Sequence, residues 1–204
     1  MSADVLVVQG PGLADAQVAW LARRVNAARA ERIDGQGARL HGAARHPDVA
    51  AYCAEAELDW GYVPAEARFA DFRLVAMDMD STLITVECID EIADLAGLKP
   101  QVAAITSAAM RGEIEFRESL ARRVALLEGL EEGALQSVYD ERVRLSPGAD
   151  ALLARVRDTG ARTLLVSGGF TFFTERLKQR LGLDYALANV LASHEGRLTG
   201  QILG

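Results

Sequence analysis

A short apolar run that ends in two aspartates constrains this chain more than any other feature. Residues 74–77 read LVAM, a pattern typical of a buried strand, and residues 78–82 read DMDST. Side chains two positions apart in a strand project to the same side. We therefore expect Asp78 and Asp80 to converge at the carboxyl end of the strand, which is where open α/β sheets bind their ligands.

Two carboxylates held that close repel each other unless a cation or a shared proton relieves the repulsion. Oxygen-rich sites favour Mg²⁺, so Asp78 and Asp80 predict a magnesium site. The same geometry leaves one carboxylate free to act as a nucleophile and the other to transfer a proton. For the bare pattern a plainer interpretation is favoured: a strand that ends in a polar turn, with Asp80 or Ser81 capping the next helix.

A second polar motif lies between an apolar strand and a helix. Residues 162–166 predict a buried strand, residues 167–169 (SGG) a loop, and residues 170–181 a helix. A hydroxyl group beside amides that glycines leave exposed suits an anion, although an ordinary strand–helix turn uses the same residue types. Together with the two aspartates, the motif predicts that Ser167 and Gly168 bind a phosphate group.

The bulk composition restricts the classes of partner. Of the 204 residues, 50% are hydrophobic, which is enough for a core, and the net charge is −7. The negative charge disfavours nucleic acid or an anionic membrane as the main partner. No apolar run is long enough to span a membrane, and the N-terminus lacks the pattern of a signal peptide. Cys53 and Cys88 have no metal or redox spacing, so we expect reduced thiols and a cytoplasmic protein.

Residues 1–70 predict a small α/β domain that is separate from the aspartate motif. The hydrophobic pattern indicates strands at 5–9, 38–41 and 60–64, helices at 14–28 and 47–56, and a linker at 65–71. The domain contains no ligand motif, so packing or dimerisation is the simplest role for it. A homodimer is left open on this basis.

The rest of the chain predicts a sheet that a helical insertion interrupts. Four helices are expected within residues 84–145, with Pro100 opening the second of them and Gly97, Gly112 and Gly129 ending the first three. The sheet domain then comprises residues 71–83 and 146–204. Its later elements are a helix at 149–159, strands at 162–166 and 185–191, and a hairpin at 195–196. Strands that alternate with helices predict an α/β fold with a parallel, doubly wound sheet.

Several motifs in the same order resemble those of the phosphoserine phosphatases among the haloacid dehalogenase-like hydrolases. DMDST at 78–82 is similar to the first motif of that family, and LVSGGF at 165–170 is similar to the second. The remaining matches are ECIDEIA at 87–93, AMRG at 109–112, FRESL at 116–120, RRVALL at 122–127, LGLDYA at 181–186 and GRLTG at 196–200. The resemblance implies a Rossmann-like parallel sheet in residues 71–83 and 146–204, a helical cap in residues 84–145, and a regulatory-type domain in residues 1–70.

The resemblance also implies an activity and the residues that perform it. The family hydrolyses O-phosphoserine to L-serine and phosphate with Mg²⁺, the final step of serine biosynthesis. Asp78 would be the nucleophile that forms an aspartyl-phosphate, and Asp80 would protonate the departing serine hydroxyl and then deprotonate the attacking water. Mg²⁺ would be held by the Asp78 carboxylate and the Asp80 main-chain carbonyl.

The substrate's amino-acid part would be recognised by the helical insertion. By the same resemblance, Glu87 would pair with the ammonium group and Arg123 with the carboxylate, while Met110 and Phe116 would line the pocket. A solvated helix face for Glu87 and Arg123, and packing within the insertion for Met110 and Phe116, are the alternative interpretations.

The sequence differs from the family pattern at its last residue, Gly204. The family has a further lysine and a Gly-Asp-Gly-Ala-Asn-Asp loop, which complete the phosphate and Mg²⁺ sites, and the strand that ends at Asp78 has a neighbour on both sides. We therefore expect a truncated phosphoserine phosphatase that binds Mg²⁺ poorly, has little activity, and carries that strand at an edge of its sheet. A phosphatase or phosphotransferase for another small phosphomonoester, and a noncatalytic amino-acid-binding or interaction fragment, are the alternatives.

Overall fold

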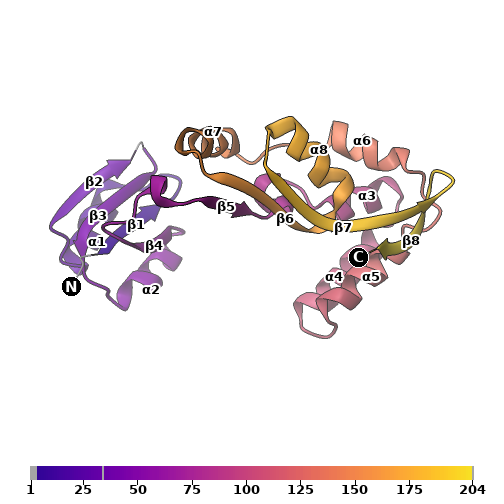
Figure 1. The fold of residues 1–204 in the computed structure, drawn as a ribbon. Coiled ribbons are helices and arrows are strands. Elements are labelled where there is room, and N and C mark those ends of the chain that lie inside the picture. The colour runs from indigo at the N-terminus through magenta and orange to yellow at the C-terminus, as the bar shows by residue number, and fades with distance from the viewer. Residues whose placement is uncertain (1–3, 34, 204) are drawn as a thin grey trace. The chain divides into compact units, whose positions relative to one another are not determined.

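The computed structural model describes residues 4–33 and 35–203. They form two compact units, which divide between Asp71 and Phe72 (Figure 1). In the part of the chain that the structure describes, no helix combines the length and the apolar character that a membrane span needs.

The N-terminal unit is a four-stranded antiparallel sheet with two helices. Its elements are β1 (Asp4–Gln9), α1 (Asp15–Arg24), β2 (Arg29–Ile33), β3 (Gly37–Ala43), α2 (Asp48–Glu55) and β4 (Asp59–Pro64), and the strand order is β2-β3-β1-β4. Sequence analysis predicted both helices and three of these strands. It missed β2, because an edge strand with mostly polar residues has no apolar alternation to detect. It also extended α1 too far, since Asn26 takes a left-handed conformation (φ 50°) that ends the helical run.

Helices cover one face of this sheet. Leu6 and Val8 of β1 and Leu40 of β3 pack with Leu21 of α1 and Val49 of α2 in a single buried cluster. The alternate positions of the strands face the other way. The unit therefore has a hydrophobic core of its own.

The second unit contains a mixed sheet in the order β5-β6-β7-β8. Strands β5 (Leu74–Met77), β6 (Arg162–Phe170) and β7 (Tyr185–His194) are parallel, and β8 (Arg197–Leu203) returns antiparallel to β7. Helices α7 (Ala149–Thr159) and α8 (Thr171–Leu181) connect the parallel strands, as parallel pairing requires. The predicted α/β fold with a parallel sheet is confirmed, and β5 lies at one end of the strand order.

A four-helix segment is inserted between β5 and α7. It comprises α3 (Cys88–Leu95), α4 (Lys99–Met110), α5 (Phe116–Ala125) and α6 (Gly133–Glu141), preceded by a tight turn, η2 (Met79–Leu83). A shorter turn, η1 (Phe69–Asp71), ends the N-terminal unit. The chain enters and leaves the segment through a narrow neck, where Ile84 forms a β-bridge with Leu145 and the Ser146 amide donates to the Leu83 carbonyl at 3.0 Å.

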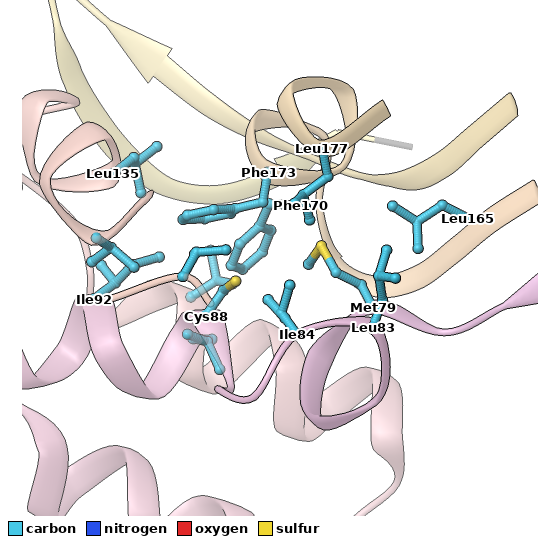
Figure 2. Packing of buried hydrophobic residues seen from close by; sticks show 14 of the residues in the cluster. Met79, Leu83, Ile84, Cys88, Ile92, Leu135, Leu165, Phe170, Phe173 and Leu177 are labelled. Atoms are coloured by element: carbon cyan, nitrogen blue, oxygen red, sulfur yellow. The ribbon is translucent and has the colours of Figure 1, made fainter. Parts of the chain in front are cut away.

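The inserted helices and the sheet share one hydrophobic core, shown in Figure 2. The residues labelled there come from the turn after β5, from α3 and α6, and from β6 and α8: Met79, Leu83, Ile84, Cys88, Ile92, Leu135, Leu165, Phe170, Phe173 and Leu177. Because this core fixes the turn after β5 against β6 and α3, it also fixes the polar groups that these elements carry on their other side.

Candidate active site

The two aspartates after β5 are placed by the residue between them. Met79 is fully buried in the shared core, while Asp78 and Asp80 have extended backbones (ψ 162° and 134°). Alternate residues of an extended segment face opposite sides, so the burial of Met79 turns both aspartates toward the same side. Ser81 then takes a left-handed conformation (φ 53°) that starts the turn into the inserted helices.

Both aspartates line a cavity of about 250 Å³ between the strand ends and the inserted helices. Of the eight site residues predicted from the sequence, seven contribute to its wall: Asp78, Asp80, Glu87, Phe116, Arg123, Ser167 and Gly168. The eighth, Met110, is 86% exposed and lines an adjoining cavity of about 480 Å³, to which Glu87, Phe116 and Arg123 also contribute. Ile89 and Leu120 add an apolar wall that sequence analysis did not identify.

Asp80 is the more enclosed of the two carboxylates. Its Oδ1 accepts a hydrogen bond from the Cys88 amide at 3.0 Å, and its Oδ2 accepts one from the Ser167 hydroxyl at 3.4 Å. Burial raises the pKa of Asp80 above its ordinary value, and the negative charges of Glu87 and Asp78 add to the rise, although the contact with Cys88 opposes it. The arrangement favours a carboxyl group that holds a proton and can donate it.

Asp78, in contrast, faces open space. Its residue is exposed, and its Oδ2 accepts a hydrogen bond from the Thr82 hydroxyl at 3.4 Å, which is a long contact. One turn of chain thus presents an accessible carboxylate next to an enclosed one. Two carboxylates with different environments suit different roles in acid–base and nucleophilic chemistry.

Residues 167–169 belong to β6, which corrects the prediction of a loop that precedes the helix. The pairing with β7 is irregular here: Val166 pairs with Leu187, but Phe170 pairs with Asn189, so the three residues bulge from the ladder. The Gly169 amide donates to Ser167 Oγ at 2.8 Å. This amide is therefore held inside the bulge. The sequence had predicted that the amides of this motif would be free to bind an anion, and the amide of Gly169 is not free in this arrangement.

The two glycines of the bulge allow close approach of their neighbours. A Cβ atom at Gly169 would lie 2.8 Å from Asp80 Oδ2, and one at Gly168 would lie 2.9 Å from the ring of Phe116. Both distances are shorter than a Cβ atom tolerates, so a larger residue at either position would displace the Asp80 carboxylate or the Phe116 ring.

Asn189 supports this bulge from β7, and sequence analysis missed it. Its side-chain amide donates to the carbonyls of Gly168 and Gly169 at 2.8 and 3.3 Å. The only available signal was a single amide residue within the otherwise apolar strand at 185–191. The partners of that amide come from another strand, so the sequence could not assign it a role.

Glu87 and Arg123 stand on different helices at the same cavity. Glu87 Oε1 accepts a hydrogen bond from the Ser81 hydroxyl at 2.7 Å. Arg123 Nε donates to the Ser119 carbonyl at 3.4 Å. Its guanidinium forms no ion pair with a carboxylate in residues 4–33 and 35–203, although its positive charge acts on Asp90 from a greater distance. The cavity therefore has an anionic group on one wall and an uncommitted cation on another.

The donors around Asp78 suit a hard cation, but they are few. The available ligands are carboxylate and main-chain oxygens, the type that Mg²⁺ prefers. Among the described residues, no group of three or more His, Cys, Asp or Glu side chains is arranged to hold a metal ion. Asp78 and Asp80 thus fit part of a magnesium coordination sphere.

Comparison with known proteins places these features in a family. The model described as haloacid dehalogenase-like hydrolase matches residues 75–204, and a second model, described as a domain of unknown function, matches residues 6–49. A phosphoserine phosphatase of a Polaromonas species is 55% identical over 139 residues, which cover 68% of this chain and 59% of that protein.

Two solved structures are also similar. The unliganded structure of a probable phosphoserine phosphatase from Vibrio cholerae has a TM-score of 0.75 and 34% identity, and the match covers 99% of this chain and 63% of that chain. A phospho-aspartyl intermediate analogue of phosphoserine phosphatase has a TM-score of 0.61 and 39% identity, covering 65% of this chain and 63% of that chain. In each comparison the match spans less than two thirds of the other protein.

Proposed function

Because this chain belongs to the haloacid dehalogenase-like hydrolases, we propose that it hydrolyses a phosphate monoester, with O-phosphoserine as substrate and L-serine and phosphate as products. The observation that carries the proposal is one cavity that gathers two aspartates, a serine–glycine bulge, and a Glu–Arg pair from three separate parts of the chain. They offer a nucleophile, a proton donor and partners for the charged groups of an amino-acid ester, which phosphoryl transfer from such an ester uses.

The first step uses the difference between the two aspartates. A carboxylate oxygen of Asp78 attacks phosphorus, the bond from phosphorus to the serine oxygen breaks, and Asp80 gives its proton to that oxygen. The products of this step are L-serine and a phosphate ester on Asp78. The exposure of Asp78 and the burial that raises the pKa of Asp80 support these roles.

The second step returns both residues to their starting states. Asp80, now a carboxylate, takes a proton from a water molecule as its oxygen attacks phosphorus. The bond from phosphorus to the Asp78 oxygen breaks and inorganic phosphate leaves. Ser167, whose hydroxyl reaches Asp80 at 3.4 Å, is positioned to contact phosphate oxygens at the same edge of the sheet.

Mg²⁺ belongs to this proposal as the cofactor. It would be held in part by the Asp78 carboxylate and the Asp80 main-chain carbonyl, and it would supply positive charge that neutralises the phosphate oxygens. A cytoplasmic location, the serine-biosynthetic context and a homodimer stay predictions.

The amino-acid substrate follows from the charges on the cavity wall. Glu87 offers a carboxylate for an ammonium group, and the uncommitted guanidinium of Arg123 offers two parallel donors for a carboxylate. Phosphoserine carries both groups next to its phosphate ester. The same wall would leave a simple phosphate ester without a partner for either charge.

The proposal is tested by phosphate release from O-phospho-L-serine in the presence of Mg²⁺. Two proteins are compared. The first is the 204-residue chain, and the second is a fusion that joins to residue 204 the segment of the Polaromonas relative that follows the matched region. Turnover that requires Asp78 in either protein would support the proposal. Folded samples of both proteins that neither bind nor hydrolyse phosphoserine would contradict it.

A further inference from the structure

Two buried oxygen atoms of the inserted helices lack hydrogen-bond partners. They are Asp90 Oδ1 on α3 and Ser119 Oγ on α5. Ser119 is only 1% exposed. A buried polar group without a partner is unfavourable, and native proteins that keep one usually use it for a ligand, a water molecule or catalysis.

Both residues line the cavity of about 480 Å³ that adjoins the site at the two aspartates. The two cavities have Glu87, Phe116 and Arg123 in common, so the second one continues from the first, and Asp78 lines only the first. A ligand whose phosphate lies at Asp78 would extend its other end toward Asp90 and Ser119.

The two unpartnered atoms add to charges that are already there. Asp90 follows Glu87 by three positions at the start of α3, and Ser119 precedes Arg123 by four positions on α5. Residues three or four apart lie on the same face of a helix. The wall from α3 is therefore acidic, while the wall from α5 has a guanidinium and a hydroxyl group.

A second hydroxyl in the cavity provides a contrast. Thr106 on α4 also lines the cavity, but its hydroxyl donates to the Val102 carbonyl of the same helix at 3.1 Å. Asp90 and Ser119 line the same cavity, and their unpartnered oxygens have no such bond within a helix. Thr106 has no unmet hydrogen-bonding need.

We propose that Asp90 and Ser119 are specificity-determining residues that complete the amino-acid subsite, with Asp90 accepting from the substrate's ammonium group and Ser119 donating to its carboxylate. This inference rests on the proposed function, because it assumes that the phosphate end of the ligand lies at Asp78. An ammonium group has three N–H donors, so Glu87 and Asp90 can both be engaged by one ligand.

The experiment measures binding to the 204-residue chain by isothermal titration calorimetry with three phosphate esters. O-Phosphoserine carries both charged groups, O-phosphoethanolamine carries only the ammonium group, and 3-(phosphonooxy)propanoate carries only the carboxylate. Asp90→Asn should weaken the first two about tenfold or more and leave the third unchanged. Ser119→Ala should weaken phosphoserine and the propanoate, and leave phosphoethanolamine unchanged.

Thr106→Val is the matched control, since it alters the same cavity without removing an unpartnered atom, and its affinities should stay near those of the parent. Thermal unfolding adds a second readout: Ser119→Ala should be at least as stable as the parent, because it removes a buried group that has no partner. Equal losses for all three esters, or a marked fall in stability, would overturn the inference while leaving the proposed function intact. If neither the 204-residue chain nor its fusion binds any of the esters, both the inference and the proposed function are contradicted.

Discussion

The two sheets of this protein differ in the face that their helices leave open. In the N-terminal unit, cross-strand pairs on that face join Arg29 with His41 and Glu31 with Arg39, and Glu31 contacts His41 Nε2 at 2.9 Å. In the second unit, the open face of β5, β6 and β7 carries exposed apolar side chains: Leu74, Val166, Tyr185 and Leu187.

The difference follows from how the strands pair. Antiparallel sheets commonly have one solvated face, whereas parallel sheets are normally covered on both faces. The open face of the N-terminal sheet is therefore suited to water. The parallel sheet places the ends of β5 and β6 at one edge, where it builds the candidate site, and its open apolar face is what such a sheet ordinarily buries.

The comparison predicts that the chemistry lies wholly in the second unit. Asp78→Asn should lower phosphate release by several orders of magnitude, since an amide is a poor nucleophile and each tenfold loss corresponds to about 1.4 kcal/mol of barrier. Asp59→Asn, at the exposed start of β4, is the matched control and should retain full activity. The assay uses whichever of the chain and its fusion turns over phosphoserine. Near-normal turnover by Asp78→Asn would remove this residue from the mechanism.

Arg123→Ala tests whether the inserted helices choose the substrate. Loss of one partner of a desolvated, charge-assisted contact costs roughly 2–5 kcal/mol. We therefore expect kcat/KM for phosphoserine to fall by the factor that corresponds to this free energy. The value for O-phosphoethanolamine, which has no carboxylate, should change little. If both substrates lose equally, Arg123 serves only to hold the helices together.

Replacing a leucine by alanine should have different effects on stability on the two faces of the parallel sheet. Leu165→Ala on the covered face removes a fully buried side chain and should cost about 2–5 kcal/mol of unfolding free energy. Leu187→Ala on the open face, where the side chain is 61% exposed, should change stability by less than about 0.5 kcal/mol. Urea unfolding of both variants measures the difference. Equal losses would mean that the open face is packed against something in solution.

Acid should produce the smallest effect, through Asp184 between α8 and β7. The Arg162 guanidinium, together with the Thr163 amide and hydroxyl, holds the pKa of Asp184 below its ordinary value of 3.8. A lowered pKa stabilises the fold above the ordinary value, and this stability is lost as the pH falls through the lowered value. Urea midpoints between pH 6 and pH 2 should therefore show less acid sensitivity in Asp184→Asn than in the parent. An identical pH profile would show that the contact with Arg162 does not form in solution.

Local patterns were sufficient for most of the elements. The inserted helices end near Gly97 and Gly112, where the backbone takes a positive φ that favours glycine. The apolar run at 74–77 is a strand and the two aspartates follow it. These features depend on backbone sterics and on the period of apolar residues, both of which are visible in a short stretch of sequence.

The sequence by itself determined which residue types this protein brings to its site. The aspartate motif and the serine–glycine motif, together with the resemblance to a known family, were enough to name seven of the residues that line one cavity. The tertiary structure decided the surroundings and the hydrogen-bond partners of each of them. The enclosure of Asp80 by Cys88 and Ser167, the support of the bulge by Asn189, and the unpartnered atoms of Asp90 and Ser119 all depend on packing between elements far apart in the chain. A pattern read along the sequence records periodicity and residue type, whereas burial and the partners of a hydrogen bond exist only once distant segments have come together.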